Sequence, residues 1–125
     1  MPSSAPRCVL GYTRELPFYM ELADFFIGKP GPGSLGEAIH KGLPVIVARN
    51  SWTMPQERYN TDWVRDEGLG LVVPDFGRID RAVASLLRQL PALRAGVARQ
   101  NNRAIFEVPV ILAKILAGRT IAAAA

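Results

Sequence analysis

The chain has 125 residues, with 15 Lys and Arg against 11 Asp and Glu, so its formal net charge is +4. Hydrophobic residues make up 49% and charged residues 21%, as in an average globular domain, which excludes a disordered tail, a collagen-like repeat and a coiled coil. The length fits one domain, which would bury about two-thirds of the surface of its unfolded chain.

Strand-like and helical segments alternate in the first half of the chain. A short strand is predicted at 8–12, then a helix at 17–23 with Pro17 at its first position, then a buried strand at 25–28. A loop rich in Pro and Gly leads into a helix at 34–41, which Gly42 ends as a left-handed cap. The continuous apolar run at 44–48 is typical of a parallel strand covered on both faces.

The second half continues the alternation and then becomes helical. After a loop at 49–55 we expect a helix at 56–67, terminated by Gly68, and a last strand at 70–73. Helices at about 80–90, 92–103 and 108–117 fill the rest, the last two separated near Pro109. Strands and helices joined by short loops predict right-handed βαβ units and therefore an α/β fold with a parallel sheet.

Several classes of protein are excluded by what the composition lacks. Cys8 is the only cysteine and His40 the only histidine, so neither an internal disulfide nor a Cys/His metal site is possible. The apolar run at 108–115 is interrupted and far shorter than the about 20 residues of a transmembrane helix. Residues 1–6 lack the pattern of a signal peptide, so we expect a cytoplasmic protein.

Arginine dominates the basic residues, and six arginines fall in one late stretch. We interpret this stretch as a solvated helical face in preference to a nucleic-acid or membrane patch. No aromatic residues lie between these arginines to stack on bases, so no nucleic-acid partner is expected. The six are Arg78, Arg81, Arg88, Arg94, Arg99 and Arg103.

The segment Lys29-Pro-Gly-Pro-Gly-Ser-Leu-Gly-Glu37 carries the clearest chemical signal. It follows a predicted strand and opens a helix, where backbone N–H groups and the helix dipole hold phosphate. The two prolines cannot donate, so the free donors would be the amides of Gly31, Gly33, Ser34 and Leu35. The two glycines also let the backbone approach a pyrophosphate closely, because no Cβ intervenes. This pattern predicts a phosphate-binding loop.

Two alternatives to that prediction stay open. Ser34 and Glu37 match the S-x-x-E capping box of an ordinary helix start, although this does not explain two glycines bracketed by prolines. Gly31, Gly33 and Gly36 also match the dinucleotide pattern G-x-G-x-x-G, and Arg49 after the next strand could suit a 2′-phosphate. The Walker pattern is absent.

The run 23–46, ADFFIGKPGPGSLGEAIHKGLPVI, resembles the donor-binding domain of family 28 glycosyltransferases. This is the family of the monogalactosyldiacylglycerol synthases and of the lipid-II-forming N-acetylglucosaminyltransferase. Gln56-Glu57-Arg58-Tyr59-Asn60 and Glu67-Gly68-Leu69-Gly70 continue the pattern, and the resemblance covers about residues 8–117. The galactosyltransferase branch is the nearer match through Lys29, the Gly-Pro-Gly run and Gln56-Glu57.

The resemblance implies a UDP-sugar donor site with a role for each matching residue. The loop would hold the diphosphate, the following helix the ribose, the start of the next helix the sugar, and an aromatic residue would lie beside the uracil. The resemblance assigns Gly31, Gly33 and Ser34 to the diphosphate and Glu37 to the ribose. It assigns Gln56 and Glu57, supported by Asn60, to the sugar, and Tyr12 to the uracil. Considered alone, the polar residues at 56–60 fit an ordinary helix start better than a binding role, and Tyr12 equally fits a core residue.

The implied protein is a hexosyltransferase that moves galactose, glucose or N-acetylglucosamine from a UDP-sugar to a lipid hydroxyl, with no cofactor and no metal. The implied partners are the nucleotide sugar, the lipid acceptor, and either a separate acceptor-domain polypeptide or a peripheral contact with the inner membrane. In this family the catalytic base lies largely in the N-terminal domain, so the sequence identifies no catalytic residue. An NAD(P)-binding oxidoreductase fragment and a non-catalytic, partner-dependent nucleotide-sugar-binding subunit are the alternatives.

The implied fold is a Rossmann-like parallel sheet with flanking helices, the C-terminal half of a GT-B glycosyltransferase. The family's sheet has the strand order 3-2-1-4-5-6, and the predicted strands match only 3, 4, 5 and 6. We therefore expect residues 1–125 to form a partial donor domain, with a core at 8–117 and a frayed tail at 118–125. Such a chain is not expected to transfer sugar alone.

Overall fold

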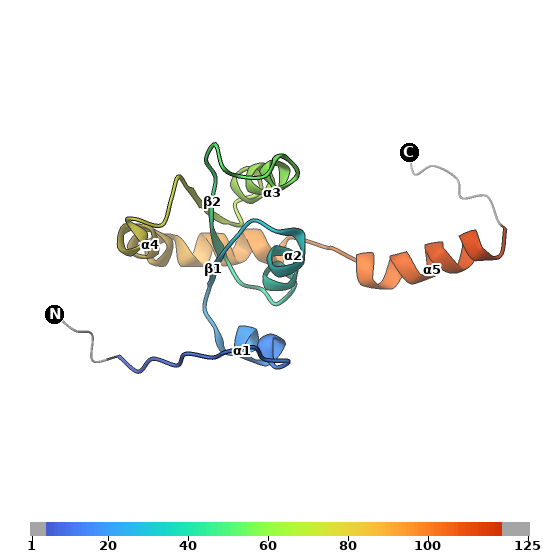
Figure 1. The fold of residues 1–125 in the computed structure, drawn as a ribbon, viewed down its shortest axis with the longest axis horizontal. Coiled ribbons are helices and arrows are strands. Elements are labelled where there is room, and N and C mark those ends of the chain that lie inside the picture. The colour runs from blue at the N-terminus through green and yellow to red at the C-terminus, as the bar shows by residue number, and fades with distance from the viewer. Residues whose placement is uncertain (1–4, 119–125) are drawn as a thin grey trace.

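A computed structural model describes residues 5–118, which form eight helices and strands (Figure 1). In chain order these are α1 (Leu16–Leu22), β1 (Phe26–Gly28), α2 (Pro32–His40), β2 (Val45–Ala48), α3 (Pro55–Asp66), β3 (Gly70–Val73), α4 (Ile79–Ala98) and α5 (Ala104–Leu116). The bounds of β3 agree fully with the sequence prediction, and those of β1, α2, β2 and α3 differ from it by one or two residues.

The three strands form one parallel sheet in the order β1-β2-β3. Ile27 lies opposite Ile46, which in turn lies opposite Leu71. The central strand β2 is buried along Val45, Ile46 and Val47, as its unbroken apolar run predicts. The predicted α/β fold with a parallel sheet is therefore confirmed.

Helices cover both faces of this sheet. Because side chains alternate along a strand, Val45 and Val47 point to one face and Ile46 to the other. The first two pack against the helices α2 and α3, through residues such as Leu35 and Val64. Ile46 packs against α4, in a cluster that includes Ala82, Leu86 and Leu93. The result is a three-layer arrangement with the hydrophobic core on both sides of β2.

The loops that follow the strands gather at one edge of the sheet, because parallel strands share the direction of their carboxyl ends. Side-chain hydrogen bonds join these loops to their neighbours. Asn50 after β2 donates through Nδ2 to the carbonyl of Pro74 after β3, at 2.8 Å. Asn60 on α3 donates through Nδ2 to the carbonyl of Pro30 after β1, also at 2.8 Å. Ligands of open α/β sheets bind at this carboxyl edge.

The predicted strand at 8–12 is wrong. This segment has no regular secondary structure, and Val9 and Tyr12 are each 94% exposed. A strand is stable only when a neighbour accepts and donates its backbone hydrogen bonds, and the described sheet contains no strand paired with this segment. Its apolar residues alone therefore do not make it a strand.

The predicted helix boundaries near Pro91 and Pro109 are also wrong. The helix α4 runs from Ile79 to Ala98 with Pro91 inside it, and α5 begins at Ala104 with Pro109 inside it. An internal proline costs about 3 kcal/mol in a helix. In α4 this cost is offset because residues on both sides of Pro91 are buried, among them Leu86 and Leu93.

Two glycines end helices as the sequence predicts. Gly42 follows α2 with φ of 82°, and Gly68 follows α3 with φ of 65°. This left-handed conformation carries no steric penalty for a residue without a Cβ. The predicted frayed tail lies, from residue 119 onward, outside the described residues.

The last helix, α5, stands apart from the α/β body in Figure 1, connected to it by residues 99–103. None of its residues is buried. Within residues 5–118, no helix has both the length and the apolar character needed to cross a membrane.

Candidate functional site

The helix α2 begins two residues earlier than the sequence predicts, and this changes the role of Ser34. Gly31 is the N-cap, Pro32 is the first helical residue, and no side chain caps the helix. Proline is well suited to this first position, because it has no N–H to lose and its φ is already helical. Ser34 is consequently the third helical residue, so the Ser34–Glu37 capping box does not form, and the Ser34 hydroxyl has no hydrogen-bond partner among residues 5–118.

The start of α2 presents unused backbone donors. The first N–H groups of a helix have no intrahelical acceptor. The Leu35 amide already donates to the carbonyl of Gly31 at 3.1 Å, so the sequence prediction of a free donor at Leu35 is wrong. For the amides of Gly31, Gly33 and Ser34 the structure shows no hydrogen-bond partner among residues 5–118. Gly33 and Ser34 are exposed, so an anion can reach this positive end of the helix.

The start of α3 lies against the same loop. A Cβ placed on Gly31 would meet only Oε1 of Glu57, at 3.6 Å. Asn60, one turn further along α3, makes the hydrogen bond to the Pro30 carbonyl described above. Glu57 and Asn60 are both half-buried, and Pro30 is buried. Pro30 and the start of α3 are distant in sequence but lie in contact beside the free amides. The hydrogen bond of Asn60 fixes the position of the loop.

We expect Asn60→Asp to destabilise the protein by about 1–2 kcal/mol. The substitution keeps the shape of the side chain but removes the donor, leaving the Pro30 carbonyl without its partner and facing a carboxylate. Gln56→Glu is the matched control, because Gln56 is exposed on the same helix and its amide contacts only the sulfur of Met54, at 3.7 Å. Urea unfolding of both variants measures the difference, and equal stabilities would contradict the role of Asn60.

Glu37 lies on the next turn of α2 and lines a hollow together with Gly33, Gly36 and His40. The far wall of this hollow is formed by Asn102, Ala104 and Ile105, from the segment that joins α4 to α5. Gly36 leaves open space above the helix, since a Cβ there would meet no atom within 4 Å. Glu37 therefore lies beside this hollow, one turn along α2 from the free amides of Gly33 and Ser34.

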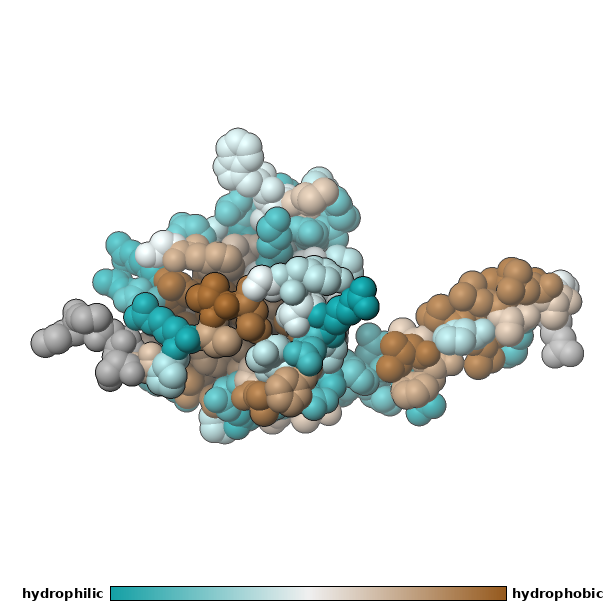
Figure 2. Space-filling model, turned by 60° about the horizontal axis from the view of Figure 1, so that its bottom comes forward, coloured by the Kyte–Doolittle hydropathy of each residue, from teal (hydrophilic) through white to brown (hydrophobic). Residues whose placement is uncertain are grey.

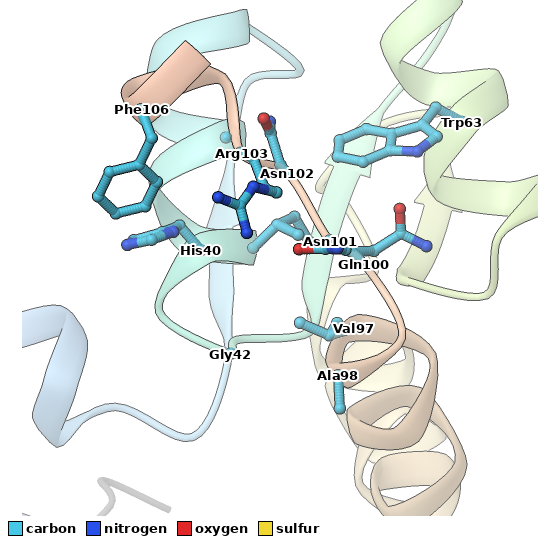
Figure 3. A pocket seen from close by; sticks show the side chains of 12 residues that line it. His40, Gly42, Trp63, Val97, Ala98, Gln100, Asn101, Asn102, Arg103 and Phe106 are labelled. Carbon is cyan, nitrogen blue, oxygen red and sulfur yellow. The ribbon is translucent and has the colours of Figure 1, made fainter.

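A second hollow of about 360 Å³ adjoins the first and shares Gly36, His40 and Asn102 with it. Figure 3 shows His40, Arg103 and Phe106 close together on one side, with Trp63 and Gln100 on the other. Residues 100–106 were not expected to line a cavity, because most of them were predicted to lie inside a helix. A run of three amide side chains, Gln100-Asn101-Asn102, is the signal that could have marked a loop.

Two predicted site residues lie away from this group. Gln56 is exposed at the start of α3, and its contact with Met54 does not tie it to the loop. Tyr12 is almost fully exposed on the irregular segment before α1 and lines neither hollow. The structure thus brings together Gly31, Gly33, Ser34, Glu37, Glu57 and Asn60, and leaves Gln56 and Tyr12 outside the group.

Arg49, considered above for a 2′-phosphate, is already engaged. Its Nη1 forms an ion pair with Asp62 and donates to Thr61 Oγ1 at 3.2 Å. Asp62 also accepts from Arg65, whose pKa is raised, first by its hydrogen bond to Asp66 and then by the nearby carboxylate charges. Binding a 2′-phosphate at Arg49 would require the guanidinium to give up Asp62, so the structure does not favour this role.

The parallel sheet, its covering helices and the amide-rich loop at its carboxyl edge define an α/β protein of the Rossmann-like class. No model of a known protein family matches the chain. Individual proteins do match, among them two named as sugar transferases and one named as the synthase of a galactolipid.

Over 81 residues the chain is 33% identical to the probable monogalactosyldiacylglycerol synthase 2 of Oryza sativa subsp. indica, covering 65% of this chain and 17% of that protein. It is 36% identical over 80 residues to the processive diacylglycerol β-glucosyltransferase of Bacillus subtilis, a match that covers 63% of this chain and 20% of that protein. It is 31% identical over 96 residues to the UDP-N-acetylglucosamine–N-acetylmuramyl-(pentapeptide) pyrophosphoryl-undecaprenol N-acetylglucosamine transferase of Leifsonia xyli. This match covers 77% of this chain and 27% of that protein.

These matches confirm the resemblance to family 28 glycosyltransferases. They also agree with the class of enzyme that the resemblance implies, because two of these relatives are named as sugar transferases and the third as the synthase of a galactolipid. The matched segments span less than a third of the length of these relatives. What each whole relative does therefore passes to this chain only as a proposal.

Proposed function

We propose that this chain supplies the UDP-sugar-binding part of a hexosyltransferase that transfers galactose, glucose or N-acetylglucosamine to the hydroxyl of a lipid. The observation that carries the proposal is the set of three free amides, at Gly31, Gly33 and Ser34, at the carboxyl edge of the parallel sheet. The names of the relatives support the lipid acceptor, and one of them names a UDP-sugar.

The diphosphate of the donor would bind at the start of α2. Amides there point outward at the positive end of the helix dipole, and the Ser34 hydroxyl adds a further donor. These groups are held in place before the reaction, so they can stabilise the charge that develops on the departing diphosphate. We therefore assign that task to the protein itself and propose no metal cofactor.

The charge of Glu57 decides where the sugar lies. Its carboxylate faces Gly31 and would repel a phosphate placed on that side of the loop. A sugar hydroxyl, in contrast, can donate to this carboxylate, and Gln56 on the same turn offers both a donor and an acceptor. We therefore place the sugar beside Glu57, the phosphates over Gly33 and Ser34, and the ribose beside Glu37.

In the proposed reaction the oxygen of the acceptor hydroxyl forms a bond to the anomeric carbon of the sugar. The bond from that carbon to UDP breaks, its electron pair leaves with the diphosphate, and the hydroxyl proton passes to a general base. The residues of this chain bind and orient the donor. We propose that the acceptor binds to an adjoining domain or a partner polypeptide, and that the complete protein acts in the cytoplasm at the surface of the inner membrane.

Isothermal titration with UDP and with NADP⁺ tests the class of ligand directly. We expect heat of binding from UDP and none from NADP⁺, because Arg49 is held by Asp62. Binding of NADP⁺ without UDP would instead favour the oxidoreductase alternative and contradict the proposal.

For Glu37→Ala we expect weaker UDP binding, by about 1.5–3 kcal/mol at most, since a hydrogen bond to a charged group contributes that much. Glu37 is only half-buried and takes part in none of the ion pairs within the described part of the chain, residues 5–118, so the variant should keep its fold. Glu37→Gln retains one acceptor oxygen and should lose less affinity. Unchanged affinity of the folded alanine variant would refute contact between Glu37 and the ribose.

A further inference from the structure

The strand β3 has an open edge that no other strand covers within residues 5–118. It is an outer strand of the described sheet and pairs only with β2. The carbonyls of Leu69 and Val73 accept hydrogen bonds from the β2 side, from the amides of Val45 and Arg49. Because backbone groups alternate in direction along a strand, Val72 turns its N–H and its carbonyl away from β2. The edge therefore offers a free donor and a free acceptor to a further strand.

A hollow of about 520 Å³ follows this edge. On one side it is lined by three consecutive strand residues, Leu71, Val72 and Val73. On the other side it is lined by residues three or four positions apart, which lie along one side of α4 and its N-cap over about two turns. The hollow is therefore an elongated groove between β3 and α4, with room for an extended segment. The residues on the helix side are Arg78, Arg81, Ala82 and Ser85.

The strand β3 lacks the features that commonly protect a free edge. Its four residues, Gly-Leu-Val-Val, include no charged side chain and no proline. Native proteins block such edges with charges, prolines, bulges or a covering element, because an open edge is a template for pairing with another chain. Here α4 packs on one face of the sheet and leaves the groove beside it open.

Two guanidinium groups stand beside the groove without a partner. Arg78 and Arg81 are exposed, and the structure gives neither side chain an ion pair or a hydrogen bond among residues 5–118. Asp75 also lines the groove, but its Oδ1 already accepts from the amide of Gly77 at 2.7 Å. The groove thus carries an excess of positive charge and is complementary to carboxylates.

These features select a partner more sharply than apolar surface does. Figure 2 shows α5 as a mainly hydrophobic arm, and such a surface attracts apolar partners of every kind. At the β3 groove, in contrast, the free backbone groups require an extended polypeptide and the two arginines require acidic side chains. A second copy of β3 meets the first requirement only, because it has no carboxylate to offer.

We propose that the groove between β3 and α4 binds an extended acidic segment of a partner protein, which joins the sheet as a further strand. The backbone of the segment pairs with Val72, and its carboxylates face Arg78 and Arg81. Main-chain hydrogen bonds supply affinity in this mode of recognition, and alternate side chains supply specificity. The inference goes beyond the proposed function and uses none of the residues assigned to the donor.

Fluorescence anisotropy with synthetic peptides, without nucleotide, tests the proposal. The probe is a labelled hexapeptide in which valine and glutamate alternate. We expect it to bind, to bind less tightly as salt screens the charges, and to bind more tightly than the same peptide with lysine in place of glutamate. Two further peptides carry N-methyl groups on the valine amides or on the glutamate amides. One of them should lose binding and the other keep it, because only alternate amides of an added strand face β3.

Arg81→Glu should weaken binding of the acidic peptide about threefold or more, since it replaces an attraction near the protein surface by a repulsion. Arg99→Glu is the matched control. It makes the same change of charge at an exposed position 18 residues further on, about 27 Å away at the other end of α4. It should bind as the unaltered chain does, and circular dichroism checks that both variants remain folded.

Four results would overturn the proposal: no binding of the acidic peptide, equal binding of the acidic and lysine peptides, equal binding of the two N-methylated peptides, or equal binding by the two arginine variants. A dimer in sedimentation velocity together with no peptide binding would assign the groove to a second copy instead. Calorimetry measures the UDP site separately, so failure of the groove is distinct from failure of the donor site.

Discussion

Gly96→Ala is expected to destabilise the protein by about 2 kcal/mol, although the same change inside a helix ordinarily stabilises by about 1 kcal/mol. Gly96 lies in α4 and is buried where that helix crosses the turn before β3. A Cβ at this position would lie 2.2 Å from the carbonyl oxygen of Gly68 and 3.2 Å from that of Glu67. Both atoms belong to the backbone, so relief of the clash requires the helix or the turn to move.

Gly36→Ala is the matched control for this prediction. Gly36 also lies inside a helix, α2, but a Cβ there would meet no atom within 4 Å. We therefore expect this variant to be more stable than the unaltered chain by up to about 1 kcal/mol. Urea unfolding without nucleotide measures both, and shifts of the same sign would show that helix propensity alone governs the two positions.

The elements that the sequence predicts well are those whose signal is local. The apolar runs ending in Ala48 and Val73 are strands because the same residues that favour extended backbone also fill the core on both sides of the sheet. Gly42 and Gly68 end helices because each must adopt positive φ, which the sequence marks with the one residue that does so freely.

The elements that the sequence predicts badly depend on distant partners. Val9 and Tyr12 look like strand residues, but a strand also needs a neighbour, and none is paired with them in the described sheet. Pro91 looks like a helix boundary, but the buried residues on either side of it keep α4 continuous. In both cases the deciding contact lies far away in the sequence, where a local pattern carries no information.

The features of the candidate site also fall into those with a local sequence signal and those that depend on distant contacts. The free amides of Gly33 and Ser34 follow from a strand, a glycine-rich loop and a helix in succession, so the sequence suffices to predict them. The hydrogen bond from Asn60 to Pro30 and the approach of residues 100–106 to α2 depend on how elements pack. The sequence accordingly suggested that Asn60 supports sugar binding, and only the structure shows that it holds the loop.

Gly33→Asp is expected to weaken UDP binding about fivefold or more, the largest effect on binding that we predict. Gly33 is the second residue of α2, is exposed, and has open space where a side chain would begin. A carboxylate there would stand beside the proposed diphosphate and repel it, by about 1–4 kcal/mol at a separation near 4 Å. Calorimetry should also show the loss shrinking as salt screens the two charges.

The stability of this variant separates the electrostatic effect from misfolding, because the two predict opposite results. An acidic residue in the first turn of a helix interacts favourably with the dipole, so thermal unfolding of Gly33→Asp should occur at the same or a higher temperature. Gly33→Asn has nearly the same shape without the charge and should bind UDP much more tightly than the aspartate variant. If the two variants bound UDP equally, the diphosphate could not lie at the start of α2, and the donor would have to be placed elsewhere along the carboxyl edge.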